Sequence, residues 1–374
     1  MCIRDRYVYS LRSLVVSVSR CATSFPRFAG GPSPVCAHSR GASSTDARMR
    51  PMAKSLGSFR AALPIGWGVL GLAGMLYARS KGIPSWAALP VVAAFLIEYP
   101  FYLVPGFQSV RERLSGIGVP IFALAAAVLP YLACCCGAVA FTWSGLARVV
   151  AVALALGLWY LVLPPSRLTD VAYLALWAAV LLGRYFNPVY TPLHPEFREL
   201  KNVILIPHLA MISTAVMALM LQRHVSETGY GFVPDRREWR IGVLHFLYFV
   251  PVGLPLALVL RATHFVSPRP LWYIAATFVG MLWVASLSEE FFVRGVLQQW
   301  IEDWTFSRNG ALLITSAIFG LLHLWLGGFP NWKWALVAGV LGWFCGRARN
   351  QAGSIRASMV THALVATAWR GFFA

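Results

Sequence analysis

Two adjacent glutamates lie inside an apolar segment of the chain. Glu289 and Glu290 belong to Ser-Leu-Ser-Glu-Glu-Phe-Phe-Val-Arg-Gly, residues 286–295, which follows an apolar run that begins near Leu271. An acid at membrane depth costs about 2.5 to 3.5 kcal/mol on insertion scales, so ionisable residues in a membrane helix indicate a functional site. Arg294, four residues after Glu290, can neutralise that glutamate on one helical face. Glu289 is then left without a partner, which favours a chemical role.

Two histidines are expected at the same depth as these glutamates. If the chain turns near Phe306, the glutamates lie 16 or 17 residues before the turn and His323 lies 17 after it, about 25 Å along each helix. A later segment returns to the same side near Asn350, and His362 lies 12 residues beyond, about 18 Å along. Helix tilt of about 20° can absorb this difference. A lone membrane histidine is often only an interhelical hydrogen-bonding residue. The shared depth is what favours a functional site.

Two carboxylates, a guanidinium and two imidazoles at one level of a bilayer can bind and activate water. A buried carboxylate can act as a general base. The imidazoles can orient the same water, stabilise an oxyanion or bind a metal ion. If a divalent metal such as zinc is present, its expected ligands are Glu289, His323 and His362. The residues alone leave a metal-dependent and a metal-free mechanism open.

These residues resemble the motifs of the CPBP family, the CaaX proteases and bacteriocin-processing enzymes that are also called the Abi family. Its three motifs look like Glu-Glu-x-x-x-Arg at 289–294, Phe-x-x-x-His at 319–323 and a final membrane histidine at 362. The similarity covers about residues 240–374. The family consists of multi-pass intramembrane endopeptidases, described as glutamic-type and earlier as metalloproteases. The resemblance implies that Phe319 is a packing residue.

The resemblance also assigns roles to the polar residues. By position, the catalytic residues would be Glu289, Glu290, Arg294, His323 and His362. Glu289 would activate water, with Glu290 and Arg294 supporting it. His323 and His362 would complete the water or oxyanion site. The implied activity is hydrolysis of a peptide bond in a membrane-associated peptide or protein.

One position departs from the family pattern. The third motif usually continues with a polar residue four positions after the histidine, and here that position is Ala366. Deleting an oxyanion donor raised the barrier by about 2.7 to 4 kcal/mol in other enzymes. Thr361 and Thr367 are the candidates to compensate.

Composition predicts a polytopic membrane protein. Of the 374 residues, 58% are hydrophobic and 12% are charged, whereas soluble chains are on average about half apolar and about a quarter charged. Apolar segments follow one another from residue 64 to residue 372. Judged against the roughly 20 residues that a crossing needs, they give about eight to eleven spans. We therefore expect an all-α transmembrane helix bundle. The resemblance implies a CPBP-like core in its C-terminal half, and a prokaryotic cell membrane is the expected location.

The formal net charge of +18 is spread through the short connectors between apolar segments. Basic connectors beside anionic headgroups explain this distribution, so membrane lipid is an expected partner. Nucleic acid is not an expected partner, because no basic block is interleaved with exposed aromatic residues. If the spans alternate, arginines gather on the side of the N-terminus, which favours a cytoplasmic N-terminus. These arginines are Arg111, Arg113, Arg236, Arg237, Arg240, Arg347, Arg349 and Arg356.

The chain divides into four segments by composition. The first segment is rich in Ser and Arg and poor in acids, which is typical of a disordered tail or a targeting segment. An artefact is the favoured interpretation, because Met-Cys-Ile-Arg-Asp-Arg resembles a translated sequencing adaptor, with a true start at Met49 or Met52. The four segments are residues 1–60, the N-terminal transmembrane helices 61–222, a polar connector 223–240 and the protease-like core 241–374.

Two rival functions use the same residues. A proton- or cation-coupled transporter would use Glu289, Glu290, His323 and Glu98, a second intramembrane acid that the protease hypothesis does not explain. Such a transporter is expected to show two related halves, and none is detected in the sequence. A noncatalytic immunity or scaffold protein would retain the protease fold. The substrate of a protease is not defined by these residues, because CPBP relatives act on prenylated Cys-a-a-X tails or in bacterial peptide maturation.

Overall fold

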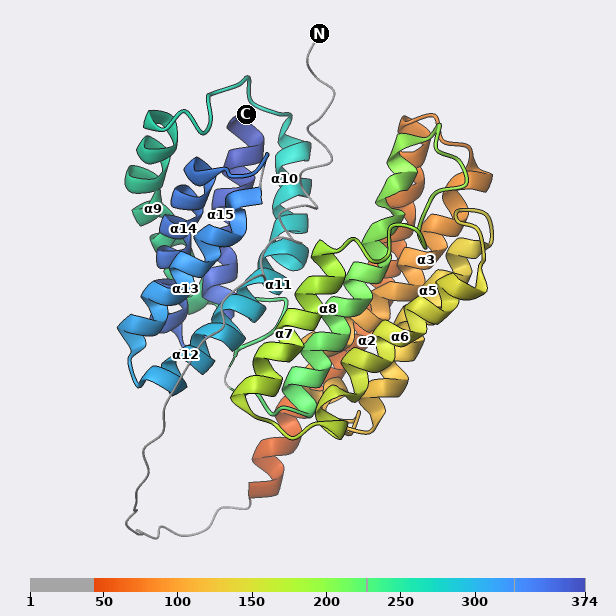
Figure 1. Cartoon of the computed structure of the whole chain (residues 1–374), viewed down its shortest axis with the longest axis horizontal. Coiled ribbons are helices and arrows are strands. Elements are labelled where there is room, and N and C mark those ends of the chain that lie inside the picture. The colour runs from red at the N-terminus through yellow and green to blue at the C-terminus, as the bar shows by residue number, and fades with distance from the viewer. Residues whose placement is uncertain (1–43, 227, 326, 374) are drawn as a thin grey trace.

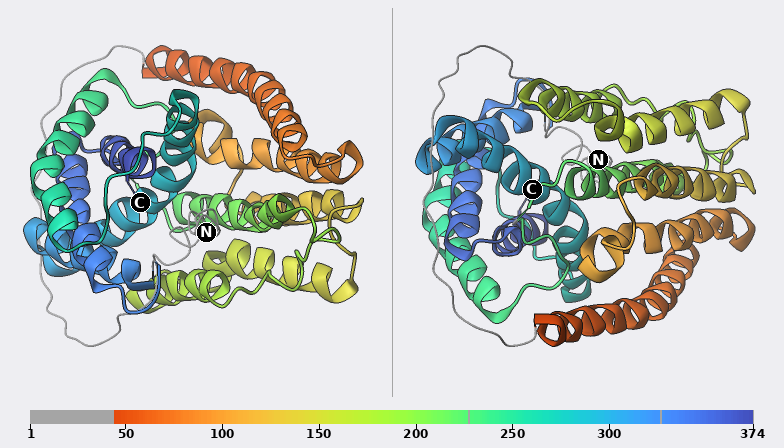
Figure 2. Two further views of the ribbon diagram at one scale, coloured as in Figure 1. Left: turned by 90° about the horizontal axis from the view of Figure 1, so that it is seen from above. Right: turned by 90° about the horizontal axis from the view of Figure 1, so that it is seen from below.

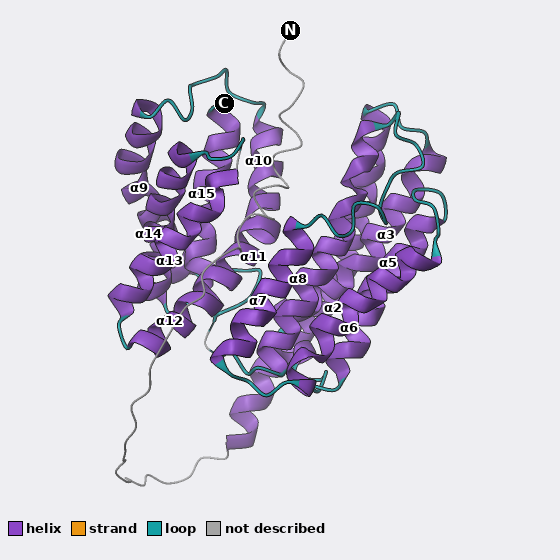
Figure 3. Cartoon of the chain, in the orientation of Figure 1, coloured by secondary structure: helices purple, strands orange, loops and turns teal. Residues whose placement is uncertain are grey.

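Most of the described residues lie in helices. The computed structural model describes residues 44–226, 228–325 and 327–373 (Figure 1). Within these ranges no β-strand forms, and the only extended pairings are isolated bridges between Val139 and Pro192 and between Phe265 and Phe373 (Figure 3). The expected all-α architecture is confirmed.

Seven helical segments in the described ranges are long and apolar enough to cross a membrane. This number of spans makes the protein an integral multi-pass membrane protein. Helices also form at residues 167–182, 308–322, 332–352 and 355–372, where the sequence predicted further spans, but these helices are shorter or more polar than the seven. The seven segments are Ser58–Ser80, Ser85–Gly106, Gly118–Cys135, Trp143–Val162, Arg198–Leu221, Arg236–Val259 and Leu271–Thr305.

The helices form two groups that lie side by side (Figures 1 and 2). In the N-terminal group, α8 is apolar on all faces and packs against α3, α5 and α6. A helix with no polar face belongs in the interior, and most of α8 is buried accordingly. The group consists of α2 (Ser44–Ser80), α3 (Ser85–Leu103), η1 (Val104–Gly106), α4 (Gln108–Arg111), α5 (Gly118–Cys135), α6 (Trp143–Val162), α7 (Arg167–Leu182), η2 (Arg198–Ile204) and α8 (Leu205–Leu221).

A partly buried ion pair joins one end of this group. Arg223, just after α8, donates to both carboxylate oxygens of Asp170 on α7, at 2.7 and 2.8 Å. Tyr160 on α6 donates to the same carboxylate at 3.1 Å. Bidentate arginine–carboxylate contacts are directional as well as strong. Three helices are therefore fixed to one another at this end.

The C-terminal group surrounds α15. That helix packs against α9, α10 and α14, and α14 packs in turn against α9 and α13. The group consists of α9 (Arg236–Val259), α10 (Leu271–Gly280), η3 (Met281–Ser286), α11 (Leu287–Glu290), η4 (Phe291–Leu297), α12 (Gln298–Thr305), α13 (Arg308–Leu322), η5 (His323–Trp325), α14 (Trp332–Ala352) and α15 (Ile355–Phe372).

Two predicted segment limits can be compared with these bounds. The N-terminal segment was expected to end near residue 60. Its residues 1–43 lie outside the described residues, and residues 44–60 form the start of α2. The polar connector ends earlier than residue 240, because α9 begins at Arg236. Asp235 accepts a hydrogen bond from the Glu238 backbone N–H at 2.8 Å, and Glu238 accepts one from the Asp235 N–H at 2.7 Å. This reciprocal cap starts the helix.

The hairpin predicted near Phe306 forms at that residue. α12 ends at Thr305, and Phe306 adopts the left-handed conformation with φ of 53°. Ser307 then starts α13 by accepting a hydrogen bond from the Gly310 backbone N–H at 3.0 Å. Because the chain reverses here, α13 runs back along the segment that contains the glutamates.

The apolar run 271–303 is not the regular helix that we expected. It forms a continuous helical segment, but the turns at 281–286 and at 291–297 are π-helical. The glutamates occupy the short α-helical stretch between them. Wide turns of this kind are frequent at functional sites. They change the direction of the side chains relative to a regular helix, which hydrophobic periodicity alone does not reveal.

The N-terminal group packs onto the glutamate-bearing segment. The rings of Trp177 on α7 and Phe292 lie 4.3 Å apart between centroids. Tyr102 on α3 donates to the Trp283 carbonyl at 2.9 Å, and the Trp283 indole donates to the Phe232 carbonyl at 2.9 Å. These contacts hold the segment against α3, α7 and the connector before α9.

A close helix contact holds α13 against α14. A Cβ placed on Gly320 would lie 2.5 Å from the Ala335 carbonyl oxygen and 3.2 Å from the Gly339 Cα. Small residues at such contacts let membrane helices approach closely. We expect Gly320→Ala to lower the free energy of unfolding by about 1–3 kcal/mol through overpacking. Thermal unfolding in detergent measures the effect.

Gly280 provides the matched control. It is also helical, but a Cβ there would meet no atom within 4 Å. Gly280→Ala is expected to leave the unfolding temperature unchanged or slightly raised, because alanine favours helix over glycine. Equal unfolding temperatures for the two variants would contradict the tight α13–α14 contact.

Candidate active site

The predicted site residues, called the polar cluster below, are Glu289, Glu290, Arg294, His323 and His362. Glu290 has the most polar contacts among them. It is fully buried, and its Oε1 lies 2.9 Å from His362 Nδ1. Its Oε2 lies 3.5 Å from Arg294 Nε, which completes the predicted i, i+4 pair. Because a carboxylate only accepts hydrogen bonds, His362 donates through Nδ1. The ring orientation of His362 is therefore set by Glu290, and its Nε2 is left available.

Arg294 links the two arms of the hairpin. It is fully buried, and its Nη1 donates to Thr315 Oγ1 on α13 at 3.1 Å. Its guanidinium also lies over the Phe319 ring, 5.5 Å from the centroid. Thr315 was not among the predicted residues. Its position one helical turn before Phe319, on the same face of α13, is the signal that could have identified it.

Glu289 has fewer and longer polar contacts than Glu290. Its Oε2 makes no hydrogen bond with any described residue, and the nearest ionisable atom is His362 Nε2 at 3.8 Å. Glu289 and His362 each keep about 5% of their surface exposed. A free carboxylate oxygen and an imidazole nitrogen therefore face each other at a distance too long for a direct hydrogen bond.

Arg370 adds a positive charge that the sequence analysis missed. It lies on α15, eight residues after His362, and interacts electrostatically with Glu289. Its Nη1 donates to the Ala366 carbonyl at 3.1 Å, which directs the side chain back along α15. With Arg294, it balances the two glutamates, which lowers the cost of placing them at membrane depth.

His323 reaches the cluster through Phe319. Its Nδ1 donates to the Phe319 carbonyl at 2.8 Å, and the two rings lie 4.7 Å apart. The Phe319 ring also meets the His362 ring at 5.7 Å, edge to face. Among the described residues, no hydrogen bond or ion pair joins His323 to either glutamate. The structure thus brings Glu289, Glu290 and His362 together with Arg294. His323 contacts Phe319, whose ring also meets that of His362.

The two threonines that were candidates to replace the missing donor differ in their contacts. Thr361 donates to the Gly242 carbonyl of α9 at 2.9 Å and thereby joins two helices. The Thr367 hydroxyl is buried and has no hydrogen-bond partner among the described residues. Only Thr367, the residue after Ala366, has a hydroxyl that is not already used.

The residues present do not fit a metal ion in this arrangement. Among the described side chains, no group of three or more His, Cys, Asp and Glu residues is placed to hold one. The expected ligands Glu289, His323 and His362 do not form such a group, although the rings of both histidines contact Phe319.

A family comparison covers the segment that holds the cluster. Residues 270–368 match the family model described as type II CAAX prenyl endopeptidase Rce1-like. The C-terminal half carries an Rce1-like domain of the CPBP family. The Rce1-like domain includes both glutamates, Arg294 and both histidines of the cluster. The resemblance inferred from the motifs is thereby confirmed.

The Rce1-like match supports an intramembrane endopeptidase at the level of the family. The match and the apolar helices both indicate a multi-pass membrane protein. A protease family of this kind also implies a peptide or protein substrate. Comparisons with curated proteins and with solved structures give no match. The N-terminal helix group lies outside the Rce1-like domain.

Proposed function

We propose that the protein is an intramembrane endopeptidase that hydrolyses a peptide bond of a membrane-anchored peptide or protein by glutamate-activated water. The contrast between the two glutamates carries this proposal. Glu290 is hydrogen-bonded to His362 Nδ1 at 2.9 Å and lies 3.5 Å from Arg294 Nε, whereas Glu289 Oε2 makes no hydrogen bond among the described residues and its ionisable neighbour, His362 Nε2, is 3.8 Å away. An unpaired carboxylate oxygen beside an oriented imidazole is a suitable place to hold one water molecule. The location in a prokaryotic cell membrane stays a prediction.

In the proposed mechanism Glu289 acts as general base and then as general acid. Its carboxylate takes a proton from water while the water oxygen forms a bond to the scissile carbonyl carbon. The carbonyl oxygen becomes an oxyanion. Glu289 then gives the proton to the amide nitrogen as the C–N bond breaks, which leaves a carboxylic acid and an amine. No other reactant is needed.

The remaining residues position these groups. Glu290 fixes His362 through its Nδ1–H, so that Nε2 faces the proposed water. Arg294 holds Glu290 and ties it to α13. His323 donates through Nδ1 to the Phe319 carbonyl, which leaves its Nε2 available for a hydrogen bond to the substrate or to water. The free hydroxyl of Thr367 is the proposed oxyanion donor in place of a polar side chain at position 366.

We expect this chemistry to proceed without a bound metal ion, because the cluster does not present a set of ligands that converge on one point. Treatment with 1,10-phenanthroline or EDTA is therefore expected to leave the cleavage rate unchanged. Elemental analysis of the active protein is expected to find substoichiometric zinc. Loss of activity on chelation, with recovery on addition of zinc, would show that a metal takes part.

Glu98 distinguishes the protease from the transporter hypothesis. It is buried in α3, and neither carboxyl oxygen has a hydrogen-bond partner among the described residues. Within the part of the chain that the structure describes, no hydrogen bond or ion pair joins it to Glu289, Glu290 or His362. Glu98→Gln is therefore expected to retain wild-type cleavage in the peptide assay. A loss as large as that of Glu289→Gln would place both acids in one functional path, as a proton-coupled transporter requires.

A cleavage assay with the full chain tests the proposal. Purified protein in proteoliposomes is mixed with a membrane-anchored fluorogenic peptide, and the products are mapped by mass spectrometry. One substrate carries a prenylated Cys-a-a-X tail and another carries the same sequence without the lipid. We expect cleavage of at least one substrate, with loss in Glu289→Gln and His323→Ala. Equal activity in all three proteins would remove the mechanism, and no cleavage by the wild type would favour a noncatalytic protein.

A further inference from the structure

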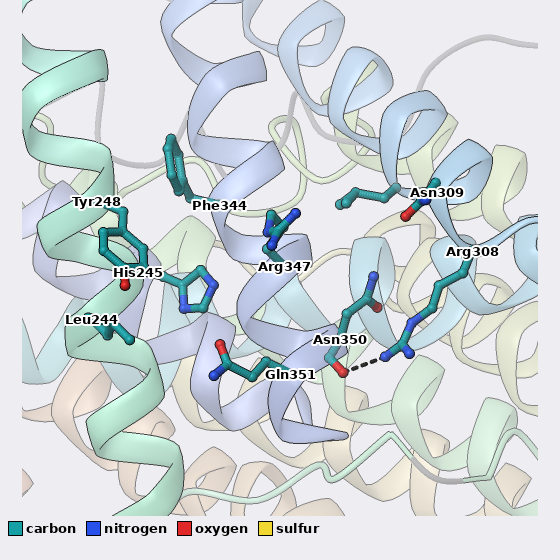
Figure 4. A pocket seen from close by; sticks show the side chains of 10 residues that line it. Leu244, His245, Tyr248, Arg308, Asn309, Phe344, Arg347, Asn350 and Gln351 are labelled. Carbon is teal, nitrogen blue, oxygen red and sulfur yellow. Dashed lines mark hydrogen bonds between the residues drawn. The ribbon is translucent and has the colours of Figure 1, made fainter.

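A polar pocket lies away from the glutamate cluster. It has a volume of about 490 Å³ and is enclosed by α9, α13 and α14 (Figure 4). Arg308, Arg347, Asn350 and His245 supply its polar wall, whereas Tyr248 and Phe344 are among its apolar residues. None of the proposed catalytic residues lines it. The pocket therefore needs its own explanation.

The pocket carries uncompensated positive charge. Arg347 is exposed, points into the pocket in Figure 4, and has no hydrogen-bond or ion-pair partner among the described residues. Arg308 donates to the Asn350 carbonyl. No acidic residue lies among the described residues that line the pocket. The nearby Arg349, by contrast, is paired with Glu302 at 3.3 Å. The two lining arginines are thus available to an anion.

His245 adds a buried polar atom to the same wall. Its side chain is 4% exposed, and its Nδ1 donates to the Ile241 carbonyl at 2.9 Å. This contact fixes the ring and leaves Nε2 available, and Figure 4 shows the ring directed toward Arg347 and Gln351. Arginine forks and an imidazole nitrogen are groups that bind phosphate oxygens well.

The pocket lies near one edge of the membrane. Arg308 is the first residue of α13, and Arg347 lies five residues before the end of α14 at Ala352. Arg308 is thus at the start of one helix and Arg347 near the end of the next, at the membrane edge that also carries Arg349 and Arg356 and that the charge distribution favours as cytoplasmic. The anionic lipids of a cytoplasmic leaflet present their headgroups at this depth.

An apolar surface continues from the pocket toward the membrane interior. Tyr248 lines the pocket and is 52% exposed, and Val252 and Val259, four and eleven residues further along the same face of α9, are 49% and 80% exposed. An exposed apolar helix face in a membrane protein contacts acyl chains. A ligand that fits both regions has a negatively charged head and a hydrocarbon tail.

We propose that this pocket binds the phosphate of an anionic phospholipid headgroup, with the acyl chains along α9. Basic pockets between transmembrane helices on the cytoplasmic side are suited to such headgroups. The apolar surface favours a lipid over free phosphate, which would use only the arginine wall. The proposal does not depend on the peptidase activity.

Lipid binding to the full chain in a neutral detergent tests the site. Native mass spectrometry counts retained phosphatidylglycerol and phosphatidylcholine, and inorganic phosphate is added in a separate arm. We expect retention of phosphatidylglycerol over phosphatidylcholine. Arg347→Gln is expected to weaken phosphatidylglycerol binding about five-fold, and Arg308→Gln by a similar factor, since each basic residue near an anionic surface contributes about that much.

Arg113→Gln is the matched control, because it removes one exposed arginine outside the pocket. It is expected to leave phosphatidylglycerol binding unchanged. Equal loss in Arg113→Gln and Arg347→Gln would reduce the effect to overall charge and overturn the site. Equal retention of both lipids would also overturn it. Displacement of the lipid by millimolar inorganic phosphate would show that the pocket takes free phosphate instead.

Discussion

Replacing Glu289 with glutamine is expected to lower kcat for peptide cleavage by about 10²- to 10⁴-fold, the usual contribution of a general base. Glutamine keeps the size of the side chain but cannot accept the proton of the attacking water. Since Glu289 makes no hydrogen bond through Oε2, the fold loses little. KM and the unfolding temperature are therefore expected to stay close to those of the wild type. Steady-state kinetics and thermal unfolding measure the two effects separately.

Glu302→Gln controls for removal of a glutamate from the same helical segment. Glu302 lies on α12 and pairs with Arg349 at 3.3 Å, away from the cluster. A partly exposed pair of this kind contributes little to stability. This variant is expected to cleave at the wild-type rate. If both glutamine variants lost activity equally, the loss could not be assigned to the unpaired oxygen of Glu289.

Arg294→Met is expected to lower the free energy of unfolding by about 3–5 kcal/mol, because it leaves a buried carboxylate without its cation. Arg294 and Glu290 are both fully buried, and Arg294 also donates to Thr315 at 3.1 Å. Methionine fills a similar volume but offers no donor. The variant is expected to unfold at a much lower temperature in detergent, and to lose cleavage because His362 is no longer held.

A double variant separates charge from packing. In Glu290→Gln/Arg294→Met neither member of the pair is charged, so most of the lost stability is expected to return. Activity is not expected to return, because the partner of His362 has changed. Additive destabilisation in the double variant would show that the two side chains act independently, contrary to the ion pair at 3.5 Å. A double-mutant cycle on unfolding free energies gives the coupling directly.

Motif spacing predicted much of the C-terminal half. Counting residues from the turn at Phe306 placed the glutamates and the histidines at a similar depth, because a helix advances by a constant rise per residue. The i, i+4 relation predicted the contact between Glu290 and Arg294 in the same way. The all-α fold followed from composition, since long apolar segments leave few alternatives in a membrane.

Other features depend on tertiary packing and have no local signal. The π-helical turns on either side of the glutamates change side-chain directions without changing the apolar pattern. The contacts of Thr315 and Arg370 with the cluster arise where separate helices meet. Spacing indicated a shared depth for His323 and His362 but did not reveal that both rings contact Phe319. That placement bears on the metal question, which the residue types alone left open.

The most direct measurement is cleavage of a membrane-anchored peptide in H₂¹⁸O by the wild type, Glu289→Gln and Glu302→Gln, prepared identically. If Glu289 activates water, the wild type and Glu302→Gln will release product with ¹⁸O in its new carboxyl group. Glu289→Gln will release at least about 10²-fold less in the same time. Labelled product from Glu289→Gln at the wild-type rate, with all three proteins folded, would contradict the account.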